Sequence, residues 1–392
     1  LQNGGTLTDN SGGTWVQSVN MPFTFNNGGT LTSEPGTDGN GDWGNFLFGS
    51  TFSVTGTGLA TISANGMGFS WAKTLTVADT VAGEDTDLLI SSSIRHDREG
   101  TVTKAGAGTV ELTGINTDPS VWDIDAGTLK IGGSGQLQSG AYVGNIINDS
   151  IFHYASSADQ TMSGSMSGSG QLVKTGTGTL TLSNDNSYSG VTTVNEGTLK
   201  LTTNHKRNLN TTYTVDGATA VLEGAAYQVF SNFGTAYDKV LTALNGGTIK
   251  SSTIAIRIGD VALSDGSSLT AESANGAYGG FYLGRLTGDA SPTVTVSGSS
   301  ASQVDGAGGI AIVSTIFDVA DVTSDSGTDL TVSVKLQDMT DASYTGGGEV
   351  DGAITKTGAG TMVLSGVNSY EGDTTINNGV LRLASGGSLN TG

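Results

Sequence analysis

The feature that most constrains the fold of this chain is a 28-residue segment that occurs three times. The copies are Lys104–Ile131, Lys174–Leu201 and Lys356–Leu383, and they align without a gap. Self-similarity at a fixed period of this size is typical of solenoids, in which each unit covers the apolar face of its neighbour. The repeat therefore predicts a stacked architecture rather than a set of independent globular domains.

Alternating apolar residues predict three short strands in each copy. Lys-x-Gly-x-Gly-Thr opens every copy, and its glycines allow a tight bend before the first strand. Side chains two apart in a strand share a face, which places Lys130, Lys200 and Arg382 outward. The inward positions are Val110, Leu112, Trp122, Ile124, Leu129 and Ile131 in the first copy, Leu180, Leu182, Thr192, Val194, Leu199 and Leu201 in the second, and Met362, Leu364, Thr374, Ile376, Leu381 and Leu383 in the third.

Two turns at fixed places connect these strands. A polar turn carrying an asparagine follows the first strand, and a glycine turns the chain before the third. Three strands, each with one inward face and with tight turns between them, predict that each copy forms slightly more than one coil of a β-helix. The turn residues are Asn116, Asn186 and Asn368, then Gly127, Gly197 and Gly379.

The pattern K-x-G-x-G-T-L-x-L-S-G-x-N-S-Y-x-G-x-T-T-I-N-x-G-T-L-x-L resembles the autotransporter-associated, or passenger-associated, β-strand repeat. Lys174–Leu201 and Lys356–Leu383 match it closely, whereas Lys104–Ile131 has Asp118-Pro119 in place of Ser-Tyr. The resemblance implies a right-handed parallel β-helix in a large exported bacterial surface protein. It implies no catalytic residue, because the repeat of that family is structural.

Composition supports one continuous all-β body. The 392 residues include 62 glycines and only 4 prolines, and Thr, Val and Ile occur in short alternating runs that disordered chains lack. We predict a right-handed parallel β-helix over residues 1–392. Within it we distinguish aromatic-rich coils in 1–103, strong repeats in 104–201, degenerate coils with loops in 202–355 and a C-terminal repeat in 356–392.

Charge and composition exclude several classes of partner. A formal net charge of −20 repels phosphates, so we expect no nucleic-acid partner. The absence of cysteine removes disulfides and cysteine-based metal sites. No stretch approaches the roughly 20 apolar residues that span a bilayer, so the chain contains no predicted membrane-spanning segment.

The first hundred residues hold much of the aromatic content. We predict that these side chains fill a bulky core, because large rings bury the most apolar area. The alternative is an aromatic face that binds sugar rings. The residues concerned are Trp15, Phe23, Phe25, Trp43, Phe46, Phe48, Phe52, Phe69 and Trp71.

The region between the second and third copies shows weak echoes of the motif. Strand-like runs at Thr253–Ile258, Thr293–Ser297, Ile310–Ile316 and Leu330–Leu336 predict further coils. Ala225–Leu244 has helical character, which indicates a short helix or a bulging loop.

Asp123 and Asp125 form the strongest candidate pair of catalytic carboxylates. Two residues apart on one strand face, they would lie roughly 6.5–7 Å apart, a separation that suits an inverting glycosidase. The repeat argues against this role, because the equivalent positions carry ordinary polar residues. These equivalents are Thr193 and Asn195, then Thr375 and Asn377. We therefore predict no catalytic residue.

Other candidate sites are weaker still. The charged run Arg95–Glu99 contains His96, and a solvated loop explains it as well as an acid–base site does. His153 and His205 are isolated and give no metal signature. The glycine pair Gly176 and Gly178 lacks the strand-then-helix context of a phosphate loop, so we expect no bound cofactor.

One stretch leaves calcium binding open. Asp38-Gly39-Asn40-Gly41-Asp42 resembles the start of an EF-hand loop, with Asp38, Asn40 and Asp42 as ligands. The match then fails, because Trp43 replaces the required glycine and Gly49 the bidentate glutamate. A polar turn between strands is the alternative, and we predict no metal site.

These observations favour a non-enzymatic structural protein, extracellular or at the bacterial cell surface. The first alternative is an adhesin whose segment 202–355 contacts a glycan or a host protein. The second is a β-helix polysaccharide lyase or hydrolase, which would need a groove lined by converging carboxylates and basic residues.

Both ends of the sequence are cut through the repeat. Asn3–Leu7 matches the third-strand sequence Asn195–Leu199, and Leu383 is followed by ASGGSLNTG rather than by a capping sequence. Solenoids need polar caps to remain monomeric. Two interpretations follow: a fragment of a longer stalk, or a subunit whose last coil accepts the first strands of the next copy, head to tail, into a fibre.

Overall fold

The fold is built from short parallel strands that wind through successive coils. The structure is a computed structural model that describes residues 1–9, 17–33, 46–83, 86–96, 100–203, 211–227, 229–230, 240–253, 256–273, 279–284, 291–339 and 350–389. The chain divides into two compact units, Leu1–Gly190 and Val191–Gly392, and each is described by itself. The predicted all-β parallel β-helix is confirmed in both units.

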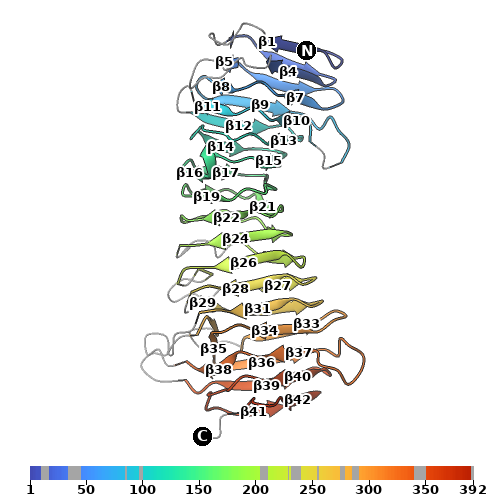
Figure 1. Ribbon diagram of the computed structural model, residues 1–392, viewed down its shortest axis with the longest axis vertical. Coiled ribbons are helices and arrows are strands. Elements are labelled where there is room, and N and C mark those ends of the chain that lie inside the picture. Colours follow the sequence, from blue (N-terminus) through green and yellow to red (C-terminus); the bar gives the residue numbers. More distant parts are fainter. Residues whose placement is uncertain are drawn as a thin grey trace. The chain divides into compact units, whose positions relative to one another are not determined.

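Strands pair with the strand one coil later, not with their neighbour in sequence (Figure 1). In unit 1, Thr6 lies opposite Thr30 and Ile151 lies opposite Gln171, offsets of 24 and 20 residues. Each offset is the length of one coil, because the chain returns to the same sheet after that many residues. Parallel pairing of this kind requires the intervening strands and turns to form a crossover.

Three faces of the helix in unit 1 carry its strands. Within the described residues, the helical content of both units is the short 3-10 turn η1 (Gln138–Gly140). The first face consists of β1 (Thr6–Asp9), β4 (Gly29–Ser33), β7 (Ala60–Ile62), β10 (Leu88–Ile90), β13 (Thr109–Leu112), β15 (Thr128–Ile131), β18 (Ile151–Tyr154) and β21 (Gln171–Lys174). The second consists of β3 (Phe23–Asn26), β6 (Phe52–Thr55), β9 (Lys73–Val77), β12 (Thr101–Ala105), β14 (Val121–Ile124), β17 (Ile146–Asn148) and β20 (Met166–Ser167). The remaining strands are β2 (Gln17–Val19), β5 (Phe46–Phe48), β8 (Met67–Phe69) and β11 (Ile94–His96), then β16 (Ala141–Tyr142), β19 (Gln160–Met162) and β22 (Thr179–Leu182).

Unit 2 follows the same rule with three sheets. The first contains β23 (Thr192–Val194), β25 (Tyr213–Asp216), β27 (Leu241–Leu244), β30 (Val261–Ser264), β33 (Thr293–Ser297), β36 (Ser314–Val319), β39 (Ala353–Thr357) and β41 (Thr374–Ile376). The second contains β24 (Gly197–Leu201), β26 (Ala220–Gly224), β28 (Thr248–Ser251), β31 (Ser268–Ala271), β34 (Ser302–Asp305), β37 (Leu330–Val332), β40 (Thr361–Leu364) and β42 (Val380–Leu383). The third contains β29 (Ile256–Ile258), β32 (Phe281–Leu283), β35 (Gly309–Ile312) and β38 (Lys335–Asp338).

The predicted strand phase of the first repeat is confirmed. Val110, Leu112, Ile124, Leu129 and Ile131 are all fully buried, because each alternate side chain points into the helix. The same holds in the second repeat for the predicted inward leucines. β12, a strand that the repeat pattern did not predict, runs into the start of the first repeat and places Lys104 inward as well.

The third repeat departs from the prediction in its last two strands. Met362 and Leu364 are buried, but Leu381 is half-buried, and Ile376 and Leu383 are 52% and 46% exposed. The reason is geometric: β41 and β42 stand at the ends of their sheets in the described chain, so no further coil covers their inward side chains. The expectation that these residues are buried is therefore wrong.

The aromatic residues near the start of the chain form a core. Phe25, Phe48 and Phe52 are at most 1% exposed, and Phe48 and Phe52 meet edge to face at 5.3 Å. This confirms the packing interpretation for the phenylalanines. Trp71 differs, because it is 61% exposed and sits in a turn at φ 66°. Trp15 and Trp43 lie outside the described residues.

The irregular middle region also forms strands. Its runs become β29, β33, β35, β36, β37 and β38. Leu241–Leu244, at the end of the stretch with helical character, is strand β27, and residues 228 and 231–239 lie outside the described part. The division into four segments, and their continuity as a single helix, stay predictions.

One sheet of unit 2 is buried on both faces. The outward side chains of its strands include Arg257, Tyr282 and Ala311, which are at most 1% exposed. Tyr282 and Ala311 form a small apolar cluster with Met339, against which Tyr227 packs. β5 and β8 of unit 1 are likewise buried along their whole length, whereas strands such as β12 and β18 alternate between buried and partly exposed residues.

Candidate functional site

Each repeat begins with a lysine that is buried rather than exposed. The Lys104 side chain is 0% exposed, and its Nζ donates to the main-chain oxygens of Ala105, Gly106 and Ala126 at 3.3, 2.7 and 2.8 Å. The ammonium therefore ties together two turns that lie one coil apart. The matching bonds run from Lys174 to the oxygens of Thr175 (2.9 Å) and Gly176 (2.6 Å), and from Lys356 to those of Thr357 (2.6 Å), Gly358 (2.8 Å) and Asn378 (3.3 Å).

The glycine at the second turn makes room for this ammonium. Gly127 and Gly379 have φ of 69° and 71°, in the left-handed region that favours glycine. A Cβ at Gly127 would lie 2.7 Å from Lys104 Nζ, and one at Gly379 would lie 2.8 Å from Lys356 Nζ. Any other residue there would strain the backbone and displace the lysine.

Burial lowers the pKa of Lys104 to about 8, and the Asp87 carboxylate opposes this shift. Burial also lowers the pKa of Lys356, against the influence of Asp318 and Asp329. An amine with a lowered pKa is a candidate general base. These amines are inaccessible to a substrate, because the side chains are fully buried and donate to main-chain carbonyls. Their role is structural.

An aspartate from the preceding coil caps the strand that follows each lysine. One carboxylate oxygen of Asp87 accepts hydrogen bonds from the main-chain nitrogens of Thr80 and Val81 at 2.6 and 2.8 Å, while the other accepts from Thr109 N. A buried carboxylate satisfied by several N–H donors holds a loop and a strand in one geometry. In the three repeats, Thr109 N donates to Asp87 Oδ2, Thr179 N to Asp159 Oδ1 and Thr361 N to Asp329 Oδ2, each at 2.7 Å.

The asparagine of the polar turn links neighbouring coils. Asn116 is buried, its Oδ1 accepts from Ile94 N at 2.9 Å, and its Nδ2 donates to Gln136 O at 3.1 Å. Ile94 is in the coil before and Gln136 in the coil after. Asn368 repeats this arrangement with Leu336 N at 2.9 Å and Ser388 O at 2.7 Å. The polar residues of the motif thus serve the stacking of coils.

The candidate carboxylate pair lies on the outer surface of β14 and the turn after it. Asp123 is partly buried and Asp125 is exposed. Burial, Asp125 and Asp149 raise the pKa of Asp123. Among the described residues, no group of three or more His, Asp or Glu side chains is placed to hold a metal ion. That these carboxylates are not catalytic stays a prediction.

The remaining sequence candidates are scattered. His153 is on β18, whereas His205 lies outside the described residues, as do Asp97–Glu99 of the charged run. Arg95 is on β11 and partly buried. Asp38, Asn40 and Asp42 also fall outside the described part, so calcium binding there stays untested.

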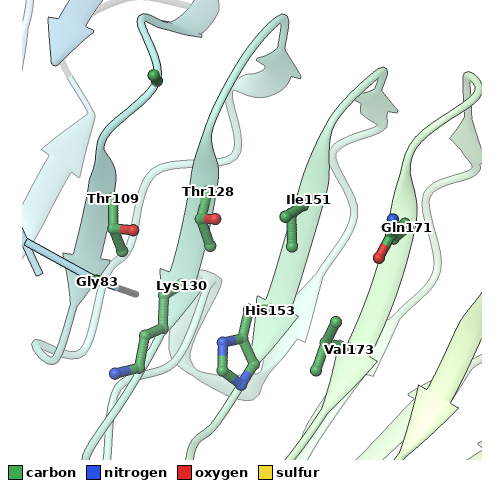
Figure 2. A pocket seen from close by; sticks show the side chains of 9 residues that line it. Gly83, Thr109, Thr128, Lys130, Ile151, His153, Gln171 and Val173 are labelled. Carbon is green, nitrogen blue, oxygen red and sulfur yellow. The ribbon is translucent and has the colours of Figure 1, made fainter. Parts of the chain in front are cut away.

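A cavity of about 270 Å³ opens on the outer face of β13, β15, β18 and β21 (Figure 2). Thr109, Thr128, Ile151 and Gln171 occupy one row across the four strands, since they lie opposite one another in the ladder. A second row lies two residues further along each strand. It consists of Glu111, Lys130, His153 and Val173, of which the last three line the cavity, together with Gly83 and Ala107 from two loops.

The charged groups of this cavity neutralise one another. Lys130 Nζ lies 3.3 Å from Glu111 Oε1, and the Thr86 hydroxyl donates to the other oxygen of Glu111. Burial and the Lys130 ammonium lower the pKa of His153 to about 4, so the imidazole is neutral at pH 7. His153 Nε2 bonds Thr175 Oγ1 at 2.8 Å. Sequence reasoning missed this cavity, because no residue of it forms a recognisable motif.

A second hollow, of about 400 Å³, lies near the turns beside β12 and β14. Its lining carries no charged side chain, and its polar side chains are the hydroxyls of Thr101 and Ser120. Val143, which is 57% exposed, forms part of its rim. The two hollows thus differ in chemistry, and only the first combines donors, acceptors and an ion pair.

Comparison with known proteins identifies the repeats. The family described as Passenger-associated-transport-repeat matches residues 102–131, 172–201 and 354–383. These bounds begin two residues before each lysine and so include part of the strand that buries it. A curated relative, the Adhesin BmaC autotransporter of Brucella suis biovar 1 (strain 1330), is 37% identical over 128 residues.

The aligned region is 33% of this chain and 3% of the relative, so the chain spans only a small part of that protein's length. No solved structure matches the chain. Within the described residues, no helix is long and apolar enough to cross a membrane. The chain is thus a parallel β-helix that contains three passenger-associated-transport repeats.

Proposed function

We propose that the chain is a non-enzymatic, extracellular part of a bacterial surface protein, in which it serves as a β-helical stalk. The observation that carries this proposal is the use of the repeat residues. The lysine and the asparagine at fixed positions hydrogen-bond to the backbone of neighbouring turns or coils, and the glycine makes room for the lysine, so these motif residues serve the stacking of coils. The passenger-type repeats and the adhesin relative support a location at the cell surface or outside the cell.

The location is tested on intact cells of the organism that makes the protein. Antibodies raised against residues 1–392 should label unpermeabilised cells or culture supernatant, and external protease should remove the cell-bound signal. Labelling that requires permeabilisation would contradict the proposal.

Adhesion is the second candidate function, and the name of the relative favours it. We propose that the outer surface contacts a glycan or a host protein, while the helix supplies rigidity. Binding of the purified chain to a glycan array without turnover would support this function. Depolymerisation of a polysaccharide would instead favour the lyase or hydrolase alternative.

We further propose that the chain associates end to end through its open strands. Ile376 on β41 and Leu383 on β42 are 52% and 46% exposed, although the aligned side chains of the other two repeats are buried. A further coil of the same kind would cover them, with main-chain hydrogen bonds along the strand edge. That coil could come from additional residues of the same polypeptide or from a second copy.

The two sources are separable by experiment. Purified residues 1–392 should increase in mass with concentration, or form fibres, if a second copy supplies the covering coil. A strictly monomeric species at high concentration would reject self-association and leave a longer polypeptide as the source.

A further inference from the structure

The cavity of Figure 2 is bordered by main chain to which one buried carboxylate is hydrogen-bonded. Gly83, on one wall, follows Thr80 and Val81, whose main-chain nitrogens donate to Asp87. The same carboxylate accepts a hydrogen bond from the main-chain nitrogen of Thr109, which also lines the cavity. Loop and sheet are therefore bound to one anchor, and the hollow is formed before any ligand arrives.

The ion pair beside the cavity is also fixed in advance. The Thr86 hydroxyl donates a hydrogen bond to Glu111, and Glu111 forms an ion pair with Lys130, whose side chain is 26% exposed. Two of the three ammonium protons remain available after one is directed at the glutamate. The cavity thus offers strong donors without a net positive charge, which disfavours binding that depends on charge alone.

His153 adds a neutral polar group at the centre of the cavity. Its Nε2 is engaged with Thr175, and Nδ1, on the other side of the ring, lies toward Lys130 in Figure 2. In a neutral imidazole one nitrogen donates and the other accepts, and a threonine hydroxyl can serve either tautomer. Nδ1 can therefore act as donor or as acceptor for a ligand group.

The rest of the lining suits a ring that carries hydroxyl groups. Gln171 is exposed and supplies an amide donor and a carbonyl acceptor, and the Thr128 hydroxyl supplies both roles. Ile151 and Val173 contribute apolar surface between these groups. A volume of about 270 Å³ lies just below the roughly 300–1,000 Å³ that holds drug-sized ligands, so the space suits one small ring.

We propose that this cavity binds one neutral sugar residue of a surface glycan. Hydroxyl groups of the ring would bond Lys130, His153 and Gln171, and its C–H face would contact Ile151 and Val173. This site would give the proposed adhesion function a class of ligand. It rests on that proposed function only in requiring that the chain is exposed to external glycans. It also places a binding site in the repeat region, outside the segment 202–355 from which sequence reasoning expected adhesion.

The test uses purified residues 1–392 and monosaccharide probes. Methyl glycosides of glucose, galactose and mannose represent neutral rings, galacturonate an anionic ring and glucosamine a cationic one. Binding is followed by saturation-transfer NMR and by the ring-nitrogen signals of histidine, of which the chain has only three. At least one neutral glycoside should bind and shift the His153 signal.

Two variants and one matched control locate the binding. Gln171→Ala removes one exposed hydrogen-bonding group and should weaken binding about fivefold, as expected for one hydrogen bond of about 1 kcal/mol. His153→Phe replaces the central polar group and should abolish binding. Gln303→Ala, which removes another exposed glutamine, from β34, should leave the affinity unchanged.

Three outcomes would overturn the proposal: no binding by any neutral glycoside, tighter binding of galacturonate than of every neutral ring, or binding that Gln171→Ala and Gln303→Ala weaken equally. Because the assay uses purified protein, its failure is separate from failure of the cell-surface location, which antibody labelling tests. Gln171 is exposed, so its variant keeps the test informative even if His153→Phe destabilises the coil.

Discussion

The first and third repeats carry the same motif but bury their apolar side chains to different extents. Leu129 and Ile131, on β15, are fully buried, whereas their counterparts Leu381 and Leu383, on β42, are half-buried and 46% exposed. β15 has paired strands on both sides, β13 and β18, whereas β42 pairs with β40 alone in the described chain. Burial is thus supplied by the neighbouring coil and not by the repeat itself.

The polar contacts of the two repeats do not differ in this way. Lys104 and Lys356 each donate to three main-chain oxygens, and Asp87 and Asp329 each cap the strand that follows. Most of these partners belong to the repeat itself or to the coil before it. The motif therefore sets its turns locally, while its hydrophobic stabilisation depends on what is stacked upon it.

Substitution of the aligned leucines by aspartate should give the largest difference in stability between the first and third repeats. Leu129→Asp would bury an unpaired charge, so we expect the free energy of unfolding to fall by at least about 4 kcal/mol. Leu381→Asp should cost only about 1–2 kcal/mol, because the half-buried side chain can reach water. Urea unfolding followed by circular dichroism measures both losses. Equal losses would show that the neighbouring coil does not decide burial.

The buried lysine should make stability rise in alkaline solution. The folded pKa of Lys104 is about 8 and its ordinary value 10.5, so between these pH values the unfolded chain binds a proton that the folded chain has released. The free energy of unfolding therefore rises with pH across this window, by up to about 3 kcal/mol.

The control for this effect is Lys104→Met, which removes the titrating group. The gap in stability between the natural chain and this variant should widen from pH 8 to pH 10.5. A gap that is constant or narrows would contradict a lowered pKa. Lys356, whose pKa is lowered by the same cause, should give the same sign.

Removing either lysine at neutral pH should affect the two repeats alike. Lys104→Met and Lys356→Met each leave buried carbonyls without their donor, at a cost of about 2 kcal/mol. The two losses should agree, because the lysine bonds within its own repeat. Thermal unfolding of both variants measures these losses of stability. A loss confined to Lys104→Met would show that the contribution of the lysine, like that of the leucines, depends on burial by a neighbouring coil.

The smallest expected effect lies on the outer face. Lys130→Ala removes a partly exposed ion pair with Glu111, and Arg382→Ala removes an exposed guanidinium at the aligned position. Each variant should change the free energy of unfolding by no more than about 0.5 kcal/mol. A loss above 2 kcal/mol in either would contradict the assigned strand phase.

Strand phase and inward residues could be predicted from the sequence, because alternation within the repeat is a local signal. The buried lysine could not. Lysine is almost never fully buried unless it is paired, so a lysine before two glycines indicates a solvated turn. One of its acceptors, Ala126, is 22 residues away from Lys104, and only the coil geometry brings them together.

The same limit applies to the aspartate cap and to the outer cavity. Asp87, Asp159 and Asp329 lie outside the 28-residue copies, at unequal distances before them, so aligning the copies does not align the aspartates. The cavity combines side chains from four strands and two loops, none of which is distinctive by itself. The cavity can be found only when the register between the strands of neighbouring coils is known, and this register cannot be derived from the sequence.

Residue-resolved hydrogen exchange tests the central claim most directly, since it compares two copies of one motif within one molecule. If a stacked coil supplies the protection, the amides of Thr128–Ile131 should exchange only through global opening of their unit. The amides of Val380–Leu383 should exchange much faster. Equal protection of the two strands, or greater protection of Val380–Leu383, would contradict the account.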